Sequence, residues 1–257
     1  MRRLIVVLAV AALAAFWFNN ACADDWSPLW ATAVLPSAVG ATAATSAGNE
    51  VFFTNGSNVD IYNTSTRVWS TANLSQARSN LAATAVGNEV FFAGGQSGTS
   101  TASKVVDIYN TSTNLWSTTS LSLAREELSA TSVGSQAFFA GGNTAGGIPV
   151  VDIYNTSTNT WSTASLSQAR YDLAATSAGG MAFFGGGINY VFGNPGNAVD
   201  IYNTSTGVWS TAALSQARSN LAATSAGNQV FFAGGDSNTG ASVVVLRPGF
   251  FEAQKLS

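Results

Sequence analysis

The chain repeats one stretch four times with few changes, and this repetition constrains the fold more than any other feature of the sequence. The copies begin at Val59, Val106, Val151 and Val199 and read VDIYNTSTRVWSTANLSQAR, VDIYNTSTNLWSTTSLSLAR, VDIYNTSTNTWSTASLSQAR and VDIYNTSTGVWSTAALSQAR. Successive copies start 47, 45 and 48 residues apart. A period of this length indicates structural units that cannot bury a core alone and therefore pack against their neighbours.

The residues between the copies complete each unit. A run of small residues follows each copy, and an aromatic run follows it in turn: LAATAVG and VFFAGG, LSATSVG and AFFAGG, LAATSAG and AFFGGG, and LAATSAG and VFFAGG. These runs are short, rich in β-branched and aromatic residues, and bounded by Gly or Asn. They predict four short β-strands per unit and no helices.

The composition of each strand predicts its place in the unit. Ala, Thr and Ser suit an innermost strand crowded around an axis, and the Phe pair suits a second strand buried on both faces. The Gly pair permits a turn with positive φ, and NTST is typical of a turn between strands. A Tyr lies seven residues before each Trp, which predicts an aromatic pair across the outer hairpin; these residues are Tyr62, Tyr109, Tyr154 and Tyr202.

The Gly pair after an aromatic strand, the Tyr, and the Trp seven residues later, repeated about every 50 residues, resemble the kelch repeat. The resemblance covers nearly all of the chain from Asp24 onward. The first unit departs from it, with Asn55 and Gly56 in place of the Gly pair, and the last unit, SVVVLRPGFFEAQKLS, lacks the Asp, the Tyr and the Trp. The resemblance implies an all-β fold, a kelch-type β-propeller of the galactose oxidase kind.

The two ends of the chain predict how the propeller closes. LWATAVLPSAVGATAATSAGNEVFF, from Leu29, aligns without a gap with VWSTANLSQARSNLAATAVGNEVFF, from Val68, which places Trp30 at the position of Trp69. The N-terminus therefore supplies an outermost strand, and the last unit has room for one. We expect five four-stranded blades closed by the N-terminal strand, and part of a six-bladed ring is the alternative.

The first residues have the pattern of a secretory signal peptide. Two Arg precede an apolar run from Leu4 to Phe18, and NNACADD follows. The pattern predicts removal of residues 1–23 and a single kelch-type propeller over residues 24–257, secreted to the extracellular space or the periplasm. The apolar run is shorter than the roughly 20 residues of a membrane span. A retained anchor is therefore a less favoured alternative. Acylation of Cys22, the sole cysteine, is also less favoured, because the preceding residues FNNA lack the Leu that such a signal normally carries.

Composition limits the partners of the predicted mature chain. Removal of Arg2 and Arg3 leaves 8 of the 10 Lys and Arg against 13 Asp and Glu, a net charge of −5. This balance argues against nucleic acid as a partner, and against membrane binding after signal cleavage. We expect a monomer whose ligand is a protein, a peptide or a carbohydrate.

The absence of His from the sequence, and of Cys from its mature part, limits the chemistry available to the chain. Galactose oxidase, a relative with kelch-type blades, needs His ligands and a Cys joined to a Tyr around copper, so its chemistry is excluded. Zinc sites and Ser-His or Cys-His nucleophiles are disfavoured for the same reason. We expect no metal, no cofactor and no catalytic residue. The enzymatic alternative resembles the bacterial sialic acid mutarotases, which are also kelch propellers, with Glu127 and either Arg125 or Asp172 as acid and base.

A repeated Asp and a repeated Arg are the charged residues most in need of partners. Each copy has the Asp at its second position and the Arg at its end; the residues are Asp60, Asp107, Asp152 and Asp200, and Arg78, Arg125, Arg170 and Arg218. Because an unpaired buried charge is costly, we expect structural ion pairs near the blade junctions, and a ring of catalytic carboxylates is the alternative. The last blade lacks the Asp and the first has Val39 in place of the Arg, which predicts that both absences fall at one junction.

We expect a ligand to bind the face that carries the loops after the Gly pairs. In an up-and-down blade these loops emerge beside the connections into the innermost strands. The residues expected at the mouth of the central channel are Asn80, Glu127, Asp172 and Asn220, with Gln96, Asn143 and Asp236 beside them. Tyr190 and Phe192 lie in the longest loop and offer an aromatic surface to a sugar or a peptide. The predicted function is a non-catalytic binding module. A structural or adhesive protein that uses its repeated NTST exterior is the alternative.

Overall fold

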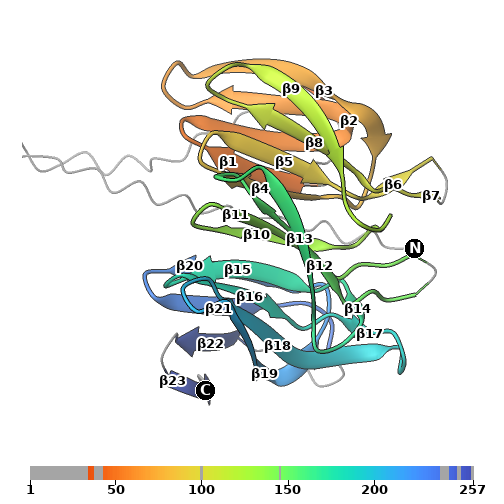
Figure 1. Cartoon of the computed structure of the whole chain (residues 1–257), viewed down its shortest axis with the longest axis vertical. Helices are drawn as coiled ribbons and strands as arrows, with labels where there is room; N and C mark the ends of the chain where they lie inside the picture. The colour runs from red at the N-terminus through yellow and green to blue at the C-terminus, as the bar shows by residue number, and fades with distance from the viewer. Residues whose placement is uncertain are drawn as a thin grey trace, which may run out of the picture.

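The computed structural model describes residues 34–37, 43–98, 101–144, 146–237, 243–247 and 250–255. The regular structure of these residues is entirely β-strand, which confirms the all-β prediction. The strands form consecutive antiparallel sheets, and Figure 1 shows the sheets following one another along the chain. The expected signal peptide and Trp30 lie outside the described residues.

The first three sheets follow the units of the sequence. The first contains β1 (Ala43–Ala47), β2 (Glu50–Asn63) and β3 (Val68–Arg78). The second has the order β4 (Ala82–Val86), β5 (Glu89–Ala93), β8 (Val105–Asn110) and β9 (Leu115–Ser120), and its loop carries β6 (Gln96–Ser97) and β7 (Thr101–Ala102). The third has the order β10 (Ser129–Val133), β11 (Gln136–Ala140), β12 (Val150–Asn155) and β13 (Thr160–Ser165).

The last two sheets keep the same order of strands. The fourth runs through β15 (Ala174–Ala178), β16 (Met181–Gly185), β18 (Asn194–Asn203) and β19 (Val208–Arg218). Two short strands, β14 (Arg170–Tyr171) and β17 (Ile188–Asn189), extend it along β18. The fifth has the order β20 (Ala222–Ala226), β21 (Gln229–Ala233), β22 (Val243–Arg247) and β23 (Phe250–Lys255).

The strand β2 supplies both middle strands of the first sheet. The backbone N–H of Thr64 donates to the carbonyl oxygen of Asn49 at 2.8 Å, as that of Thr111 donates to Asn88 in the second sheet. A straight strand as long as β2 would span roughly 46 Å, so β2 must double back between these two bonded residues. Gly56 lies in the bend with φ +62°. The first unit therefore has the four strands of the others, although its loop is shorter.

The outer hairpins have the same register in four sheets. Each Tyr lies opposite its Trp, in the pairs Tyr62 and Trp69, Tyr109 and Trp116, Tyr154 and Trp161, and Tyr202 and Trp209. The ring centroids of these pairs are 4.9 to 5.0 Å apart. The aromatic pair predicted from the spacing of seven residues is confirmed. The side-chain oxygen of Asn63 accepts the N–H groups of Ser65 and Thr66 at 3.0 Å, so the first NTST segment forms the predicted turn.

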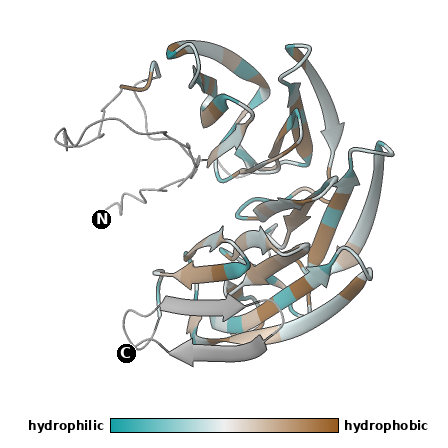
Figure 2. Cartoon of the chain, turned by 90° about the vertical axis from the view of Figure 1, so that its left-hand side faces the viewer, coloured by the Kyte–Doolittle hydropathy of each residue, from teal (hydrophilic) through white to brown (hydrophobic). Residues whose placement is uncertain are grey.

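Neighbouring sheets pack through their innermost strands. β1 contacts β4, β4 contacts β10, β10 contacts β15, and β15 contacts β20. Figure 2 shows the sheets arranged along a curved path as a result. The burial of the innermost strands differs along this path: β4 is largely buried, whereas most of β20 is exposed.

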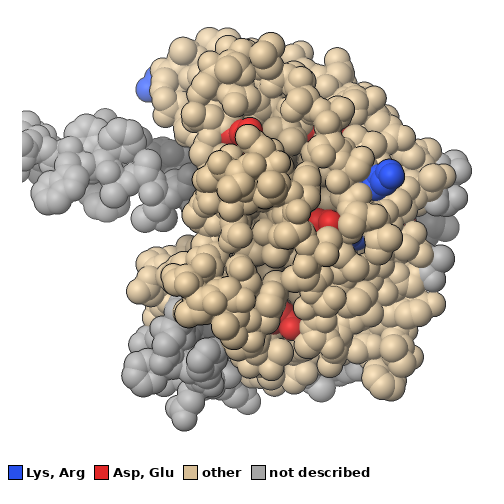
Figure 3. Space-filling model, viewed as in Figure 1, with Lys and Arg blue, Asp and Glu red and all other residues tan. Residues whose placement is uncertain are grey.

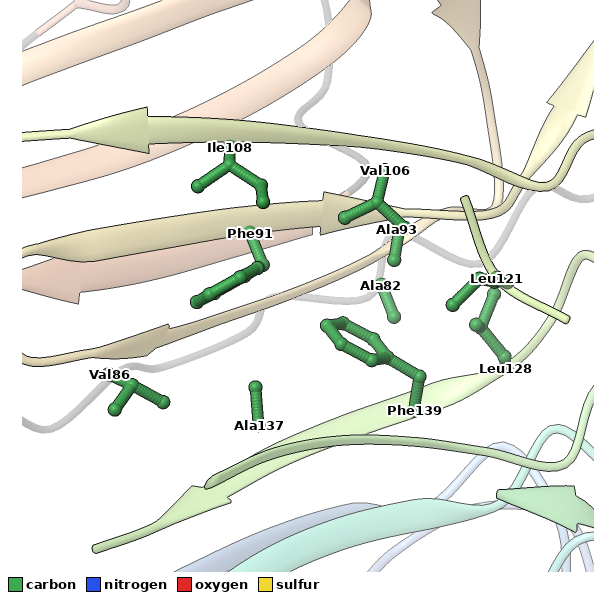
Figure 4. Close-up of a cluster of buried hydrophobic side chains, with 10 residues drawn as sticks. All are labelled: Ala82, Val86, Phe91, Ala93, Val106, Ile108, Leu121, Leu128, Ala137 and Phe139. Atoms are coloured by element: carbon green, nitrogen blue, oxygen red, sulfur yellow. The ribbon is translucent and has the colours of Figure 1, made fainter. Parts of the chain in front are cut away.

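The Phe pair of each second strand fills the space on both sides of its sheet. Phe91 of the second sheet meets Phe139 of the third edge-on, with ring centroids 6.2 Å apart. Figure 4 shows these two rings with Leu121 and Leu128 at one end of the same buried cluster. The other Phe of the second sheet, Phe92, packs in a second cluster, together with side chains of the first sheet such as Phe52. One Phe of the pair therefore faces each neighbouring sheet, and this burial is the main apolar contribution to the core.

The fifth sheet corrects the prediction for the closing strand. β23 pairs with the outer edge of β22 and is the fourth strand of this sheet, in the place where we expected the N-terminal strand. The prediction missed β23 because its sequence lacks the Tyr and the Trp that mark the outer hairpins elsewhere. The register places Val244 opposite Phe232, where the second sheet has Asp107 opposite Phe92.

Candidate functional site

Three pairs of Arg and Asp join successive sheets. The pairs are Arg78 with Asp107, Arg125 with Asp152, and Arg170 with Asp200. Each Arg therefore meets the Asp of the following sheet and not the Asp of its own copy of the repeat. Burial lowers the pKa of each of these three Arg residues, and the charge and hydrogen bond of the paired Asp oppose this shift.

Backbone groups complete these ion pairs and tie the sheets together. The N–H of Ser75 donates to Oδ1 of Asp107 at 3.0 Å. Nη1 of Arg78 donates to the carbonyl oxygens of Gly94 at 2.6 Å and Val105 at 2.7 Å. One guanidinium thus connects the end of β3 to the Gly pair and to β8 of the next sheet. These contacts indicate a structural role for the repeated Asp and Arg.

At the junction of the fourth and fifth sheets, the described residues include no counterpart of this Asp. Val244 takes the Asp position, and Arg218 of the fourth sheet donates to the side-chain oxygen of Gln216 at 2.7 Å. In the first sheet, Asp60 accepts the backbone N–H of Ser37 at 3.1 Å and its hydroxyl at 2.8 Å. Because each pair spans two sheets, the Asp missing from the fifth sheet affects its junction with the fourth, and Val39 lies outside the described residues. The expectation that the missing Asp falls where the last blade meets the first was wrong for this reason.

Four residues with left-handed backbone conformation precede the innermost strands of successive sheets. Asn80, Glu127, Asp172 and Asn220 have φ between +52° and +56°. The N–H of Glu127 donates to the carbonyl oxygen of Asn80 at 3.0 Å, that of Asp172 to Glu127 at 3.2 Å, and that of Asn220 to Asp172 at 3.0 Å. We call these four residues the left-handed row. The structure brings together all four residues that we expected at the channel mouth.

The residues that follow the Gly pairs lie beside this row. Backbone bridges join Ser79 with Gln96, Glu126 with Asn143, and Ser219 with Asp236. The side-chain amide of Asn143 donates to Glu127 at 3.4 Å, and that of Asn220 donates to Asp236 at 3.1 Å. The carboxylates of the third and fifth sheets are therefore held by amides of their own sheets.

Sequence reasoning missed Glu126, which connects the second and third sheets. Its carboxylate accepts the side-chain amides of Asn80 at 3.2 Å and Gln96 at 3.5 Å. The signal for this residue was present in the repeat. Glu126 directly follows Arg125, whereas the corresponding residues of the other units are uncharged: Ser79, Tyr171 and Ser219.

Burial and like charges raise the pKa values of the two central carboxyls. Burial, together with the charges of Glu127, Asp236 and Glu126, raises the pKa of Asp172 to about 6. Burial also raises the pKa of Glu127, which the hydrogen bond from Asn143 lowers and the charge of Glu126 raises. Asp172 is thus able to gain and lose a proton close to neutral pH.

An apolar hairpin projects beside the left-handed row. Pairing of β14 with β17 sets the base of this hairpin next to Asp172, which directly follows β14. Tyr190 is 53% exposed, and Val191 and Phe192 are 75% and 74% exposed. Tyr190 lies against the loop of the third sheet, because a Cβ at Gly147 would be only 2.7 Å from the Cβ of Tyr190. Tyr190 is therefore positioned by the neighbouring sheet, and the residues at the tip are left exposed.

Other parts of the described residues offer less to a ligand. They contain no group of three or more His, Cys, Asp or Glu side chains suited to a metal ion. A pocket of about 330 Å³ lies at the opposite ends of the strands and is lined by Val133, Gly134, Ser135, Gln136, Asn155 and Thr204. This pocket has amide and hydroxyl groups but neither a carboxylate nor an aromatic ring.

Consecutive four-stranded antiparallel sheets that pack along a curved path are typical of the β-propeller class of protein. A family model of the kelch motif matches residues 77–120, from the end of β3 through β9. The chain carries a kelch motif over these residues, and the resemblance drawn from the Gly pair, the Tyr and the Trp is confirmed. A search of curated proteins finds no match for the chain. In the part of the chain that the structure describes, no helix has the length and apolar character needed to cross a membrane.

Proposed function

We propose that this chain is a secreted kelch-type propeller that binds a glycan, a peptide or a protein without catalysis. The ligand-binding face is the one that carries the left-handed row and the loops after the Gly pairs. The observation that carries the proposal is the meeting of carboxylate and amide groups with an exposed aromatic hairpin on this face. Ligand sites commonly combine a few convergent polar groups with an apolar wall. The kelch motif supports a binding role, because it generally marks propellers that serve as protein-binding modules.

The backbone of Glu127 gives this proposal further support. Asn and Asp adopt left-handed conformations readily, whereas Glu does so at a higher conformational cost. Glu127 nevertheless has φ +56°. Residues held in sparsely populated backbone conformations cluster at functional sites. The third sheet therefore has a charged residue at this position, and the left-handed conformation of Glu127 costs it some conformational stability.

The proposed mature form spans residues 24–257 as one five-bladed propeller, after removal of residues 1–23 as a signal peptide. The five consecutive sheets support this number of blades, and a six-bladed ring is the alternative. Ser37 lies against the first sheet, where its N–H bonds Asp60 much as the N–H of Ser75 bonds Asp107.

A second candidate function is proton transfer to a sugar, as in a mutarotase. The observation that favours it is the pair of neighbouring carboxyls with raised pKa values, Glu127 and Asp172. A carboxyl with a pKa near 6 serves well as a general acid or base at neutral pH. The rate of interconversion of sugar anomers, followed by NMR with wild type and Asp172→Asn, tests this candidate. A rate equal to that without protein excludes it.

Melting temperatures measured against a panel of sugars and peptides test the binding proposal. A ligand that binds only the folded chain must raise the melting temperature. The triple variant Glu127→Ala, Asp172→Ala and Tyr190→Ala should lose this shift. The matched control replaces three exposed Ser of the NTST turns, Ser112, Ser157 and Ser205, with Ala, and should keep it. A ligand shift that survives in the first variant and disappears in the control would overturn the proposal and favour the outer turns.

A further inference from the structure

The outermost strands of the first three sheets present free backbone edges. β3, β9 and β13 each end the strand order of their sheet, so one edge of each strand pairs with no other strand of the described residues. Such an edge carries a row of N–H and C=O groups that can pair with another strand. The fourth sheet is left out of this inference because its outer strand β19 contacts β23.

The three free edges lack the features that usually block pairing. Their sequences are VWSTAN over residues 68–73, LWSTTS over residues 115–120 and TWSTAS over residues 160–165. None contains a Lys, an Arg, an Asp, a Glu or a Pro, and the pairing with the inner neighbour is continuous over these residues. Soluble proteins usually protect an edge with a charge, a Pro or a bulge.

Apart from Arg67, which is exposed in the turn directly before β3, the surroundings of these strands are also poor in charge. The Arg that ends each copy is almost completely buried, so its charge does not protect the edge. Figure 3 shows few and scattered charged atoms on the face over which β9 and β13 lie. Val68 and Leu115, which begin two of the strands, are 59% and 67% exposed. These edges thus combine free backbone groups with exposed apolar and hydroxyl side chains.

We propose that these edges pair with the same edges of a second copy of this chain. Two antiparallel copies of β9 related by a two-fold axis through Ser117 or Thr118 place only Ser, Thr, Leu and Trp opposite one another. Such pairs bring no like charges together, and Thr and Ser pairs across strands are favourable. Identical edges on both partners make a second copy the best match in chemistry and length.

Because one molecule has three similar edges, it can pair with more than one other copy. A molecule paired through β9 still offers β3 and β13, so the assembly grows with concentration. The expected monomer is then the dilute form of the protein. This inference does not depend on the ligand-binding face, because the outer strands and the left-handed row lie at different parts of each sheet.

Sedimentation velocity and light scattering of the full chain at concentrations up to about 0.5 mM test the proposal. The edge variant combines Ser70→Lys, Ser117→Lys and Ser162→Lys, three exposed positions in the middle of the free edges. The matched control combines Ser65→Lys, Ser112→Lys and Ser157→Lys, which adds the same charge in the adjoining turns. Circular dichroism and melting temperature verify the fold of both variants, and single Lys variants replace any triple variant that unfolds.

The average mass of the wild type and of the turn variant should rise with concentration, whereas the edge variant should remain at the monomer mass. A wild type that stays monomeric over the whole range overturns the proposal. Equal loss of association in both variants also overturns it, because charge alone then explains the effect. Association that persists undiminished in the edge variant overturns it as well, because another surface is then used.

Discussion

Replacement of Asp152 with Val gives the third sheet the residue that the fifth sheet has at this position, Val244. In the wild type, Asp152 accepts a hydrogen bond of 2.7 Å from Nη2 of Arg125 and one of 3.1 Å from the N–H of Ser122. Both donors lose their acceptor in the variant. The Arg125 side chain, which is 0% exposed, keeps only the 3.0 Å bond to the carbonyl oxygen of Phe139.

The expected loss is about 3–5 kcal/mol in the free energy of unfolding, because the variant leaves a buried charge without its partner. For a chain of this size each kcal/mol lowers the melting temperature by roughly 2–4 °C, so the expected decrease is roughly 6–20 °C. The double variant Arg125→Met and Asp152→Val removes both charges. It should recover most of the loss, since an apolar replacement of a buried ion pair is often neutral.

Urea unfolding followed by Trp fluorescence measures these free energies in the single and double variants. Asp60→Val in the first sheet is the matched control, because Asp60 accepts its hydrogen bonds from Ser37. This control should lose only about 1–3 kcal/mol, as expected for lost hydrogen bonds to a carboxylate. The reasoning is refuted if Asp152→Val costs no more than Asp60→Val. It is also refuted if the double variant loses the full sum of its two single variants.

Single residues of the strands, the left-handed row and the turns also have testable effects. Burial raises the pKa of Glu89, so the stability it contributes is present below the ordinary Glu pKa and is lost as the pH rises through the folded value. Glu89→Gln, which copies Gln136 of the next sheet, should remove this loss in urea unfolding measured across pH. The pKa of Asp172 is raised to about 6, so its contribution is likewise lost between its ordinary pKa and about pH 6, and Asp172→Asn should flatten the melting temperature over this range. Gly141→Ala should destabilise more than Gly134→Ala, because both have positive φ but only at Gly141 would the Cβ lie 2.6 Å from a carbonyl oxygen; equal melting temperatures would contradict this.

The strands of the repeated units could be predicted because the same residues meet the same surroundings in each unit. Local chemistry is enough to set a hairpin register such as that of Tyr62 and Trp69. The strand pairing of the fifth sheet could not be predicted in this way. The pairing of β23 with β22 depends on competition between distant segments for one edge, which no local pattern encodes. The sequence of β23 also has no counterpart in the other units.

The partners of the repeated Arg residues were only partly predictable. Their charge and expected burial required an acceptor, but the constant spacing within each copy pointed equally to the Asp of the same unit. The long side chain of Arg78 instead extends to the next sheet, where carbonyl oxygens of Gly94 and Val105 already converge with Asp107. This choice depends on how two sheets pack, and packing between sheets is invisible in the spacing along the chain.

The residues of the left-handed row followed from strand order, but their contacts did not. An up-and-down sheet places the connection into the innermost strand beside the loop after the Gly pair, which predicted Asn80 and Gln96 as neighbours. The carboxylate that both amides contact belongs to Glu126 of the next sheet. Its position depends on the short distance between the inner ends of two sheets, which only the packed structure defines.

At the positions of the left-handed row, the fold requires a positive φ but does not require a charge. Each position needs a residue that tolerates positive φ, and Asn80 and Asn220 meet this need without a charge. The third and fourth sheets instead carry Glu127 and Asp172, joined by a backbone hydrogen bond of 3.2 Å. Burial and the charge of Glu127 raise the pKa of Asp172, so the ionised pair costs stability that Asn at both positions would not. Because neither the backbone nor the core requires these two carboxylates, they are the residues whose replacement should separate ligand binding from folding.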